Sequence, residues 1–178
     1  AVHRLDLDTS GVIIVPRTSA ALSGLARQFQ ERSIDKTYHA MVAGRILHEE
    51  GEITFPLKKD WTNRPRQKVC FKTGKQSLTR WRVIDRYRNS TFVELKPVTG
   101  RSHQLRLHLL EIGHPILGCD LYAPKKVFLA APRLMLHASR ISFRHPIYLS
   151  KLSANVPPHF LTDLTTSVAW DGQTSASH

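Results

Sequence analysis

A polar segment rich in charged and hydroxyl groups lies near the start of the chain and runs directly into a short β-branched stretch. The polar segment covers residues 2–11, and the apolar run 12–15 follows it between Gly11 and Pro16. A short apolar run bounded by a glycine and a proline predicts a buried strand. The polar segment is then a loop attached to a sheet, and such loops often carry catalytic groups.

Asp6 is the residue of this loop that a simple turn explains least well. Residues 8–10 (Asp-Thr-Ser) suit a turn or a helix cap as well as a functional role, because their side chains can bond nearby backbone groups. Asp6 follows Leu5 and lies two residues from Arg4. This spacing predicts a buried carboxylate that is paired with a positive charge.

The charge of the chain favours a polyanionic partner. The 178 residues suffice for one domain with a real core. A net charge of +12 and a pI near 10.2 indicate binding to a polyanion, the alternative being a merely soluble basic protein. Cys70 and Cys119 are expected to be free thiols in a reducing compartment.

Several classes of cofactor and location are not expected. The chain has no glycine-rich phosphate loop and no Cys/His cluster, so neither a nucleotide nor a metal cofactor is predicted. It has no apolar run of the roughly eighteen residues that a membrane span needs and no visible signal peptide. A cytoplasmic protein that does not enter membranes is therefore predicted.

The remaining apolar pattern mixes helical and strand periods. It predicts a helix capped by Thr18 or Ser19 and running to Phe29, strands over 34–44, 76–88 and 91–96, a helix after Gly100, and a closing hairpin of 141–143 with 147–149. This mixture favours an α+β fold.

The second predicted helix contains two histidines that do not have the spacing of a metal pair. Gly100 permits a tight turn and Ser102 can cap the helix. Leu105, Leu109 and Ile112 form its buried stripe. His103 and His108 lie five residues apart and no acidic third ligand is near, so no zinc site is predicted.

The connection over 57–76 is long, polar and basic. Connections of this length without evident structure are usually functional or disordered. Its basic residues and its tryptophan suit phosphate contacts and base stacking, with a solvated linker as the alternative. The candidate RNA-binding residues are Lys58, Trp61, Arg64, Arg66 and Lys68.

The loop motif resembles the signature of a known enzyme family. Residues 3–6 (His-Arg-Leu-Asp), followed by 9–11 (Thr-Ser-Gly), are similar to the signature of the RluA-type pseudouridine synthases. These enzymes isomerise uridines in RNA. Later segments match further motifs of the family, in the same order, over about residues 2–160: 36–38 (Lys-Thr-Tyr), 100–106 (Gly-Arg-Ser-His-Gln-Leu-Arg), 113–118 (Gly-His-Pro-Ile-Leu-Gly) and 131–138 (Ala-Pro-Arg-Leu-Met-Leu-His-Ala).

The resemblance implies roles for five residues. Asp6 is the catalytic aspartate, as nucleophile or base at the sugar, and Arg106 is the arginine that pairs with it. Tyr38 packs against the target base, and Leu136 helps to wall the active site. Arg4 fills the gap that the flipped-out base leaves. Whether the intermediate is a covalent sugar ester or a glycal is left open.

The resemblance also implies a fold and a substrate. The fold is the mixed, mainly antiparallel sheet of this family, flanked by helices and crossed by an RNA-binding cleft. The run 60–65 (Asp-Trp-Thr-Asn-Arg-Pro) resembles the subgroup that modifies both 23S rRNA and tRNA anticodon stem-loops. The expected partner is therefore structured RNA, bound by a monomer. The chain departs from the family pattern at Cys119, where an aspartate is usual and Asp120 comes one residue late.

Two other classes of function stay open from the residues alone. One is a non-catalytic basic RNA-binding module in which Asp6 is a structural ion-pair partner. The other is a hydrolase that uses Asp6 and Asp8 as a carboxylate pair.

The chain is expected to be one catalytic domain over 1–166, followed by a flexible tail over 167–178. It begins with Ala1 inside a functional-looking loop, so the domain is expected to be truncated at its amino end.

Overall fold

The computed structural model describes residues 2–159, which form an α+β structure. The expected domain boundary at residue 166 and the tail over 167–178 lie outside the described residues. None of the helices within 2–159 is long and apolar enough to cross a bilayer.

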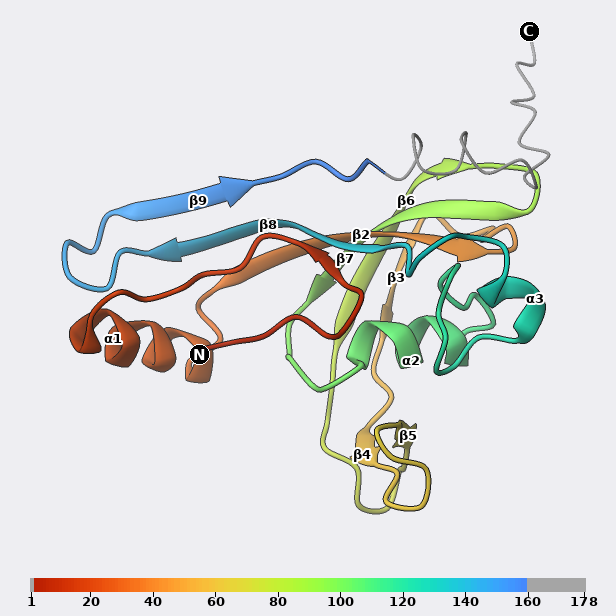
Figure 1. Cartoon of the computed structure of the whole chain (residues 1–178), viewed down its shortest axis with the longest axis horizontal. Coiled ribbons are helices and arrows are strands. Elements are labelled where there is room, and N and C mark those ends of the chain that lie inside the picture. The colour runs from red at the N-terminus through yellow and green to blue at the C-terminus, as the bar shows by residue number, and fades with distance from the viewer. Residues whose placement is uncertain (1, 160–178) are drawn as a thin grey trace, which may run out of the picture.

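A seven-stranded sheet forms the frame of the molecule (Figure 1). Its strands run in the order β1-β8-β2-β7-β6-β3, and β9 pairs with β8. Among the described strands of this sheet only β1 and β8 are parallel, so the mainly antiparallel sheet predicted from the sequence is confirmed. The strands are β1 (Ser10–Gly11), β2 (Asp35–Ala43), β3 (Glu50–Ile53), β6 (Thr79–Arg86), β7 (Ser90–Pro97), β8 (Leu136–Arg144) and β9 (Lys151–Asn155).

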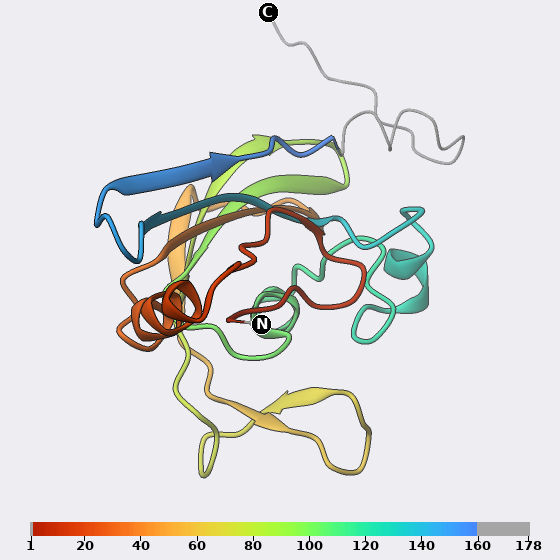
Figure 2. The same ribbon diagram turned by 60° about the vertical axis from the view of Figure 1, so that its left-hand side comes forward.

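The three helices of the described chain lie on the same side of this sheet (Figures 1 and 2). They are α1 (Ser19–Gln30), α2 (Gln104–Glu111) and α3 (Lys125–Phe128). The predicted first helix is confirmed, and the Thr18 hydroxyl caps it by accepting the Ala21 N–H at 3.2 Å. An N-cap bond of this kind satisfies one of the backbone donors that a helix start leaves free.

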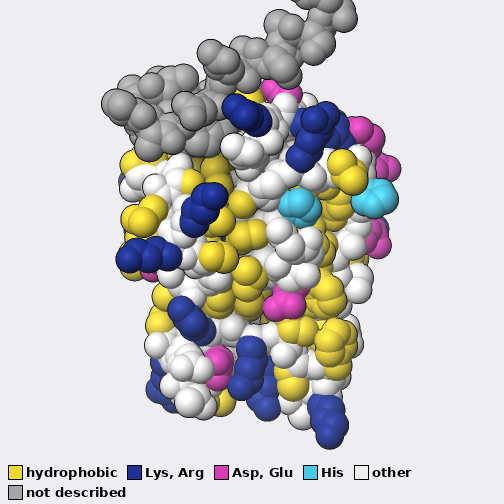
Figure 3. Space-filling model, turned by 90° about the vertical axis from the view of Figure 1, so that its right-hand side faces the viewer, with side chains coloured by type: hydrophobic (Ala, Val, Ile, Leu, Met, Phe, Trp, Pro, Cys, Tyr) yellow, Lys and Arg dark blue, Asp and Glu magenta, His cyan; other side chains and the backbone are white. Residues whose placement is uncertain are grey.

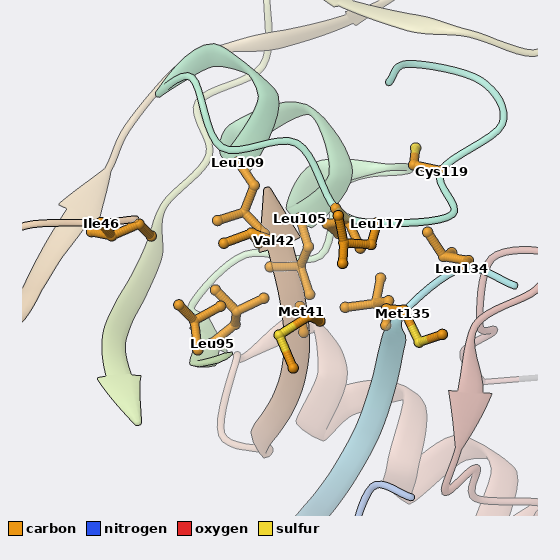
Figure 4. Close-up of a cluster of buried hydrophobic side chains, with 14 residues drawn as sticks. Met41, Val42, Ile46, Leu95, Leu105, Leu109, Leu117, Cys119, Leu134 and Met135 are labelled. Atoms are coloured by element: carbon orange, nitrogen blue, oxygen red, sulfur yellow. The ribbon is translucent and has the colours of Figure 1, made fainter. Parts of the chain in front are cut away.

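The core lies between α2 and the central strands (Figure 4). Leu105 and Leu109 of α2 pack with Met41 of β2 and Leu95 of β7, and each of these side chains is at most 7 % exposed. This packing holds the amino end of α2 at a fixed place over the sheet. Gln104–Leu109 are all buried, so the helix is enclosed on more sides than the predicted stripe.

The buried strand predicted over 12–15 is wrong. The strand at this place is β1, which ends at Gly11, and a backbone bond from the Val12 N–H to the Ala138 carbonyl continues the pairing by one residue. Ile13 is 47 % and Val15 73 % exposed. A short apolar run cannot by itself distinguish a strand from an extended segment that has one covered face.

The long connection is a hairpin instead of an unstructured loop. Strands β4 (Leu57–Lys59) and β5 (Gln67–Val69) pair antiparallel and project beyond the helices (Figure 1). We refer to residues 57–69 as the basic hairpin. Strand β3 and helix α3 have no counterpart in the sequence prediction, and β9 begins at Lys151, later than the predicted 147–149.

The cap predicted for the second helix is also wrong. Helix α2 begins after His103, which has a left-handed φ of 54° and makes no side-chain cap bond. Gln104, the first residue of α2, instead bonds to the segment before the helix: its Oε1 accepts the Arg101 N–H at 3.0 Å and the Thr99 hydroxyl at 2.7 Å. The buried amide therefore fixes the turn that leads into α2.

Candidate active site

A cavity of about 520 Å³ opens where the amino-terminal loop meets the sheet and the start of α2. Four of the residues predicted from the sequence line it: Arg4, Asp6, Tyr38 and Leu136. They come from the loop, from β2 and from β8, so the fold brings together residues that are far apart in the sequence. The size is that of an ordinary small-ligand pocket.

Asp6 is held in a turn at the wall of this cavity. The Thr9 N–H donates to the Asp6 carbonyl at 3.1 Å, and Asp8 between them has a left-handed φ of 68°. The carboxylate of Asp6 accepts the backbone N–H of His103 at 3.2 Å. Asp8 is exposed and does not line the cavity, so the paired carboxylates of the hydrolase alternative are not found there.

Tyr38 stands in the centre of the sheet beside this carboxylate. It pairs with Leu95 of β7 and with Ala138 of β8. Burial, and secondly the charge of Asp6, raise the pKa of the Tyr38 phenol to about 12. The phenol is therefore neutral at physiological pH and offers an apolar ring face to a bound group.

The ion pair predicted between Arg106 and Asp6 is wrong. The buried Arg106 guanidinium forms its ion pair with Asp120, and its Nε and Nη2 lie 3.3 and 3.2 Å from Cys119 Sγ. Within residues 2–159, Arg106 does not line the cavity. The aspartate that comes one residue late in the sequence still reaches the arginine, and Cys119 fills the remaining space beside it.

His103 and Tyr122 are neighbours of Asp6 that the sequence interpretation missed. The Tyr122 hydroxyl lies 2.5 Å from His103 Nδ1 and accepts the Gln67 N–H of β5 at 2.8 Å. Burial lowers the pKa of His103, although the Asp6 charge acts in the opposite direction. His103 has a left-handed backbone and its N–H points at Asp6. A histidine in the sequence gives no sign of this conformation, so the contact could not be predicted.

Lys36 also lines the cavity and has no assigned role in the sequence analysis. Its Nζ would lie 3.5 Å from a Cβ placed on Gly100, an ordinary contact distance, so the ammonium lies beside the turn that leads into α2. Burial lowers the pKa of Lys36. No ion pair joins Lys36 to any acidic side chain in the described part of the chain.

The basic hairpin carries the predicted RNA-binding residues away from the cavity. Trp61 is 60 % exposed, with the Arg64 guanidinium 4.1 Å from its ring centre. Lys68 pairs with Asp60 at 3.1 Å. Figure 3 shows Lys and Arg side chains at the lower end of the molecule, where this hairpin projects. The structure places Lys58, Trp61, Arg64, Arg66 and Lys68 together on the hairpin, and none of them lines the cavity.

No group of three or more His, Cys, Asp or Glu side chains that could hold a metal ion occurs within 2–159. The charged side chains that line the cavity are one carboxylate (Asp6), one ammonium (Lys36) and three guanidinium groups (Arg4, Arg32 and Arg101), and hydroxyl, amide and imidazole side chains lie among them. Such a set suits a substrate with an apolar ring and phosphate groups.

The mainly antiparallel sheet and this aspartate–tyrosine cavity define the class of protein. Residues 1–111 match the family model described as RNA pseudouridylate synthase, so the chain belongs to this family. It is therefore an enzyme of the isomerase class, as the sequence motifs predicted.

Particular relatives are similar over most of the chain. The dual-specificity RNA pseudouridine synthase RluA of Pasteurella multocida (strain Pm70) is 52 % identical over 159 residues, which cover 89 % of this chain and 73 % of the relative. The protein of the same name from Escherichia coli (strain K12) is 48 % identical over 161 residues, covering 90 % and 74 %.

A solved structure agrees with the fold. The human RNA pseudouridylate synthase domain containing 1 superimposes with a TM-score of 0.82 at 30 % identity, covering 92 % of this chain and 70 % of the human chain. Family membership and fold, both predicted from the sequence, are thus confirmed.

Proposed function

We propose that this pseudouridine synthase modifies uridines in structured RNA of two kinds, a 23S rRNA stem-loop and a tRNA anticodon stem-loop. The observation that most supports this proposal is that the Asp6 carboxylate lies in the wall of a cavity of nucleoside size, beside the neutral ring of Tyr38. The relatives are named dual-specificity RNA pseudouridine synthases, which supports the two substrates.

The first step is extrusion of the target uridine from its loop. Unstacking costs roughly a few kcal/mol and least in a loop, which favours stem-loop substrates. Arg4 is exposed at the mouth of the cavity and, in this proposal, occupies the space that the base leaves. Tyr38 then stacks on the uracil, and Leu136, on the same face of the neighbouring strand β8, forms the wall beside it.

Asp6 acts next, at the ribose. Either its oxygen attacks C1′, or it removes the proton from C2′, and in both cases the C1′–N1 bond breaks and its electron pair leaves with the uracil. The uracil rotates and C5 bonds to C1′; in the first route this displaces the Asp6 oxygen from C1′, and in the second route Asp6 returns its proton to C2′. C5 then loses its proton and N1 gains one. The carboxylate is regenerated, so the product is an isomer of the substrate and no co-reactant is consumed.

The His103 N–H supports this role. It donates to the Asp6 carboxylate at 3.2 Å and so fixes the orientation of that carboxylate in the cavity wall. Because burial lowers the pKa of His103, its ring stays neutral near pH 7 and adds no varying charge beside Asp6. Arg106 of α2 is assigned a supporting role outside the cavity, through its ion pair with Asp120.

The basic hairpin supplies affinity in this proposal. Lys58, Arg64, Arg66 and Lys68 contact phosphates, and Trp61 stacks on a base. Affinity from such contacts falls as salt rises. Family membership favours the enzyme over the alternative of a non-catalytic RNA-binding module, which also accounts for a basic surface.

Replacing Asp6 by asparagine tests the proposal. The full-length Asp6→Asn protein is expected to bind both stem-loops with the affinity of the wild type and to form no pseudouridine. Loss of a group that transfers a proton in the transition state costs about 10²–10⁴-fold, and loss of a nucleophile costs at least as much. Pseudouridine is measured by release of tritium from uridine labelled at C5.

The matched control is Asp8→Asn in the same loop. Asp8 is exposed and has a left-handed φ, which asparagine tolerates, so this variant should keep its activity. An active Asp6→Asn protein would remove Asp6 from catalysis. Conversion of one stem-loop and not the other by the wild type would contradict the dual specificity.

We also propose that the protein acts as a cytoplasmic monomer. Cys70 and Cys119 are free thiols, which suits the reducing cytoplasm. Light scattering of the free protein at increasing concentration tests the monomer, and a mass twice that of the chain would contradict it.

A further inference from the structure

The side chain of His3 joins the two arms of the loop that carries Asp6. Its Nε2 accepts the backbone N–H of Ile14 at 2.9 Å, from a residue eleven positions further along the chain. Between these two residues the chain runs out past Asp6 and turns back through β1 towards α1 (Figures 1 and 2). The hydrogen bond therefore closes a loop that contains both Arg4 and Asp6.

The two arms of this loop are held in different ways. The returning arm is fixed to the sheet, because β1 pairs in parallel with β8 and the Val12 N–H donates to the Ala138 carbonyl at 2.9 Å. We refer to residues 2–5 as the outgoing arm. Within residues 2–159 the outgoing arm forms no hydrogen bond other than the one that His3 accepts. That bond is thus what ties the outgoing arm to the anchored one.

A ring contact holds the same side chain from a second direction. The His3 ring stacks on Phe29 of α1, with the ring centres 4.8 Å apart and the planes at 25°. Both side chains are partly buried. One ring atom therefore bonds to the returning arm while the ring face packs on the first helix, and together these contacts fix the orientation of the imidazole.

The hydrogen bond requires a neutral imidazole. Because Nε2 accepts an N–H, it carries no proton, and the ring proton is on Nδ1. Burial, and secondly the charge of Lys36, lower the pKa of His3. The ring is therefore neutral near pH 7 and able to accept the Ile14 N–H.

The position of Asp6 depends on this arm. Asp6 lies three residues after His3, and its other bonds come from the opposite side. Its carboxylate accepts the His103 N–H at 3.2 Å and its carbonyl accepts the Thr9 N–H at 3.1 Å. A reacting group has to lie close to its target atom, and a misplacement of about 1 Å can cost about 100-fold in rate.

We propose that His3 is a positioning residue of the reaction: by accepting the Ile14 N–H and stacking on Phe29, it holds the outgoing arm and so places the Asp6 carboxylate at the ribose. This proposal rests on the proposed function, because it takes Asp6 to be the group that reacts. His3 acts through Asp6 and transfers no proton itself.

Two substitutions separate the acceptor from the ring. His3→Phe keeps an aromatic ring beside Phe29 but has no atom that accepts the Ile14 N–H. In His3→Gln the amide oxygen reaches about the place of Nε2, so the acceptor is kept and the ring is lost. We expect kcat of the full-length His3→Phe protein to fall about tenfold or more at nearly the wild-type KM, and His3→Gln to recover most of that loss. Wild-type kcat in His3→Phe, or equal losses in the two variants, would overturn the role of the hydrogen bond.

The matched control is His145→Phe in the turn between β8 and β9. The Nδ1 of His145 also accepts backbone N–H groups, those of Ile147 and Tyr148 at 3.2 and 3.1 Å, and its ring stacks on Tyr148. His145 does not line the active-site cavity. Its replacement should lower the unfolding temperature as His3→Phe does and leave kcat unchanged. An equal loss of kcat in both variants would show that general loosening, and not the placing of Asp6, slows the reaction.

Hydrogen exchange of two backbone amides follows the effect from His3 to Asp6. The Ile14 N–H reports the bond to the imidazole, and the His103 N–H reports the bond to the carboxylate. Both should exchange roughly fivefold faster in His3→Phe and at nearly the wild-type rate in His3→Gln. An unchanged His103 amide in His3→Phe would show that His3 does not act on Asp6. A wild type that forms no pseudouridine would instead refute the proposed function, and the exchange comparison would still decide whether His3 holds Asp6.

Discussion

Replacing Tyr122 by phenylalanine probes the link between the basic hairpin and the Asp6 loop. The Tyr122 hydroxyl accepts the Gln67 N–H at 2.8 Å and lies 2.5 Å from His103 Nδ1. A hydrogen bond contributes about 0.5–1.5 kcal/mol, so loss of both lowers the free energy of unfolding by about 1–3 kcal/mol. The phenyl ring keeps the contact with the Arg106 guanidinium, which lies 5.4 Å from the ring centre.

The same substitution is expected to slow catalysis. His103 donates its backbone N–H to Asp6, so a His103 ring that has lost its hydroxyl partner holds this peptide less firmly. A loss of about 1.4 kcal/mol in transition-state stabilisation corresponds to about a tenfold lower kcat. KM for the stem-loop substrates should change little, because Tyr122 does not line the cavity.

Urea unfolding and single-turnover conversion measure the two effects. The control is Tyr148→Phe, since Tyr148 is 78 % exposed and its ring stacks on His145 at the surface. The control should match the wild type in both assays. If Tyr122→Phe is as stable and as fast as the control, the hydrogen-bonded link does not act on Asp6 and the reasoning is refuted.

Single substitutions test three other contacts of the site and the core. Burial and a nearby carboxylate raise the pKa of Tyr38 from 10.0 to about 12, so the unfolded chain ionises first and stability falls as pH rises between these values. In Tyr38→Phe, the free energy of unfolding measured in urea should fall by about 3 kcal/mol less over this pH range than in the wild type. The same pH dependence in both proteins would contradict this prediction. Gly118→Ala should lower the free energy of unfolding by about 3 kcal/mol or more, because a Cβ would overlap the Arg133 carbonyl oxygen at a φ of +71°; near wild-type stability would refute this. Arg106→Met should lower the free energy of unfolding by about 2 kcal/mol, because it removes the charged hydrogen bond to the half-exposed Asp120. The acid side of the pH–rate profile should stay where it is in the wild type. A shifted acid side would show that Arg106 acts directly on the catalytic carboxylate.

Local pattern was sufficient where a structural element depends on its own residues. The helical spacing after Thr18 predicted α1, and the alternation around Tyr38 predicted β2. It failed at 12–15, because a short apolar run does not specify which of its faces is covered. It also failed in the basic hairpin, where the polar composition concealed the pairing of β4 with β5.

The residues of the candidate site could be predicted where they belong to a family motif. The motifs named Arg4, Asp6, Tyr38 and Leu136 as residues of one site, and all four line one cavity. They also named Arg106 as the partner of Asp6, which the structure contradicts. The partner of a long, flexible guanidinium depends on which acidic group the fold places nearest, and spacing along the chain does not report that.

The amino-acid sequence by itself determined the family, the mainly antiparallel α+β class and the positive charge that suits RNA, because these depend on residue identity and local period. Only the tertiary structure decided that His103 donates to Asp6 and that Tyr122 joins the basic hairpin to α2. The physical reason is that hydrogen bonds and charge pairs depend on distances of a few ångströms between segments far apart in the chain. Those distances are set by the packing of α2 and the loops against the sheet.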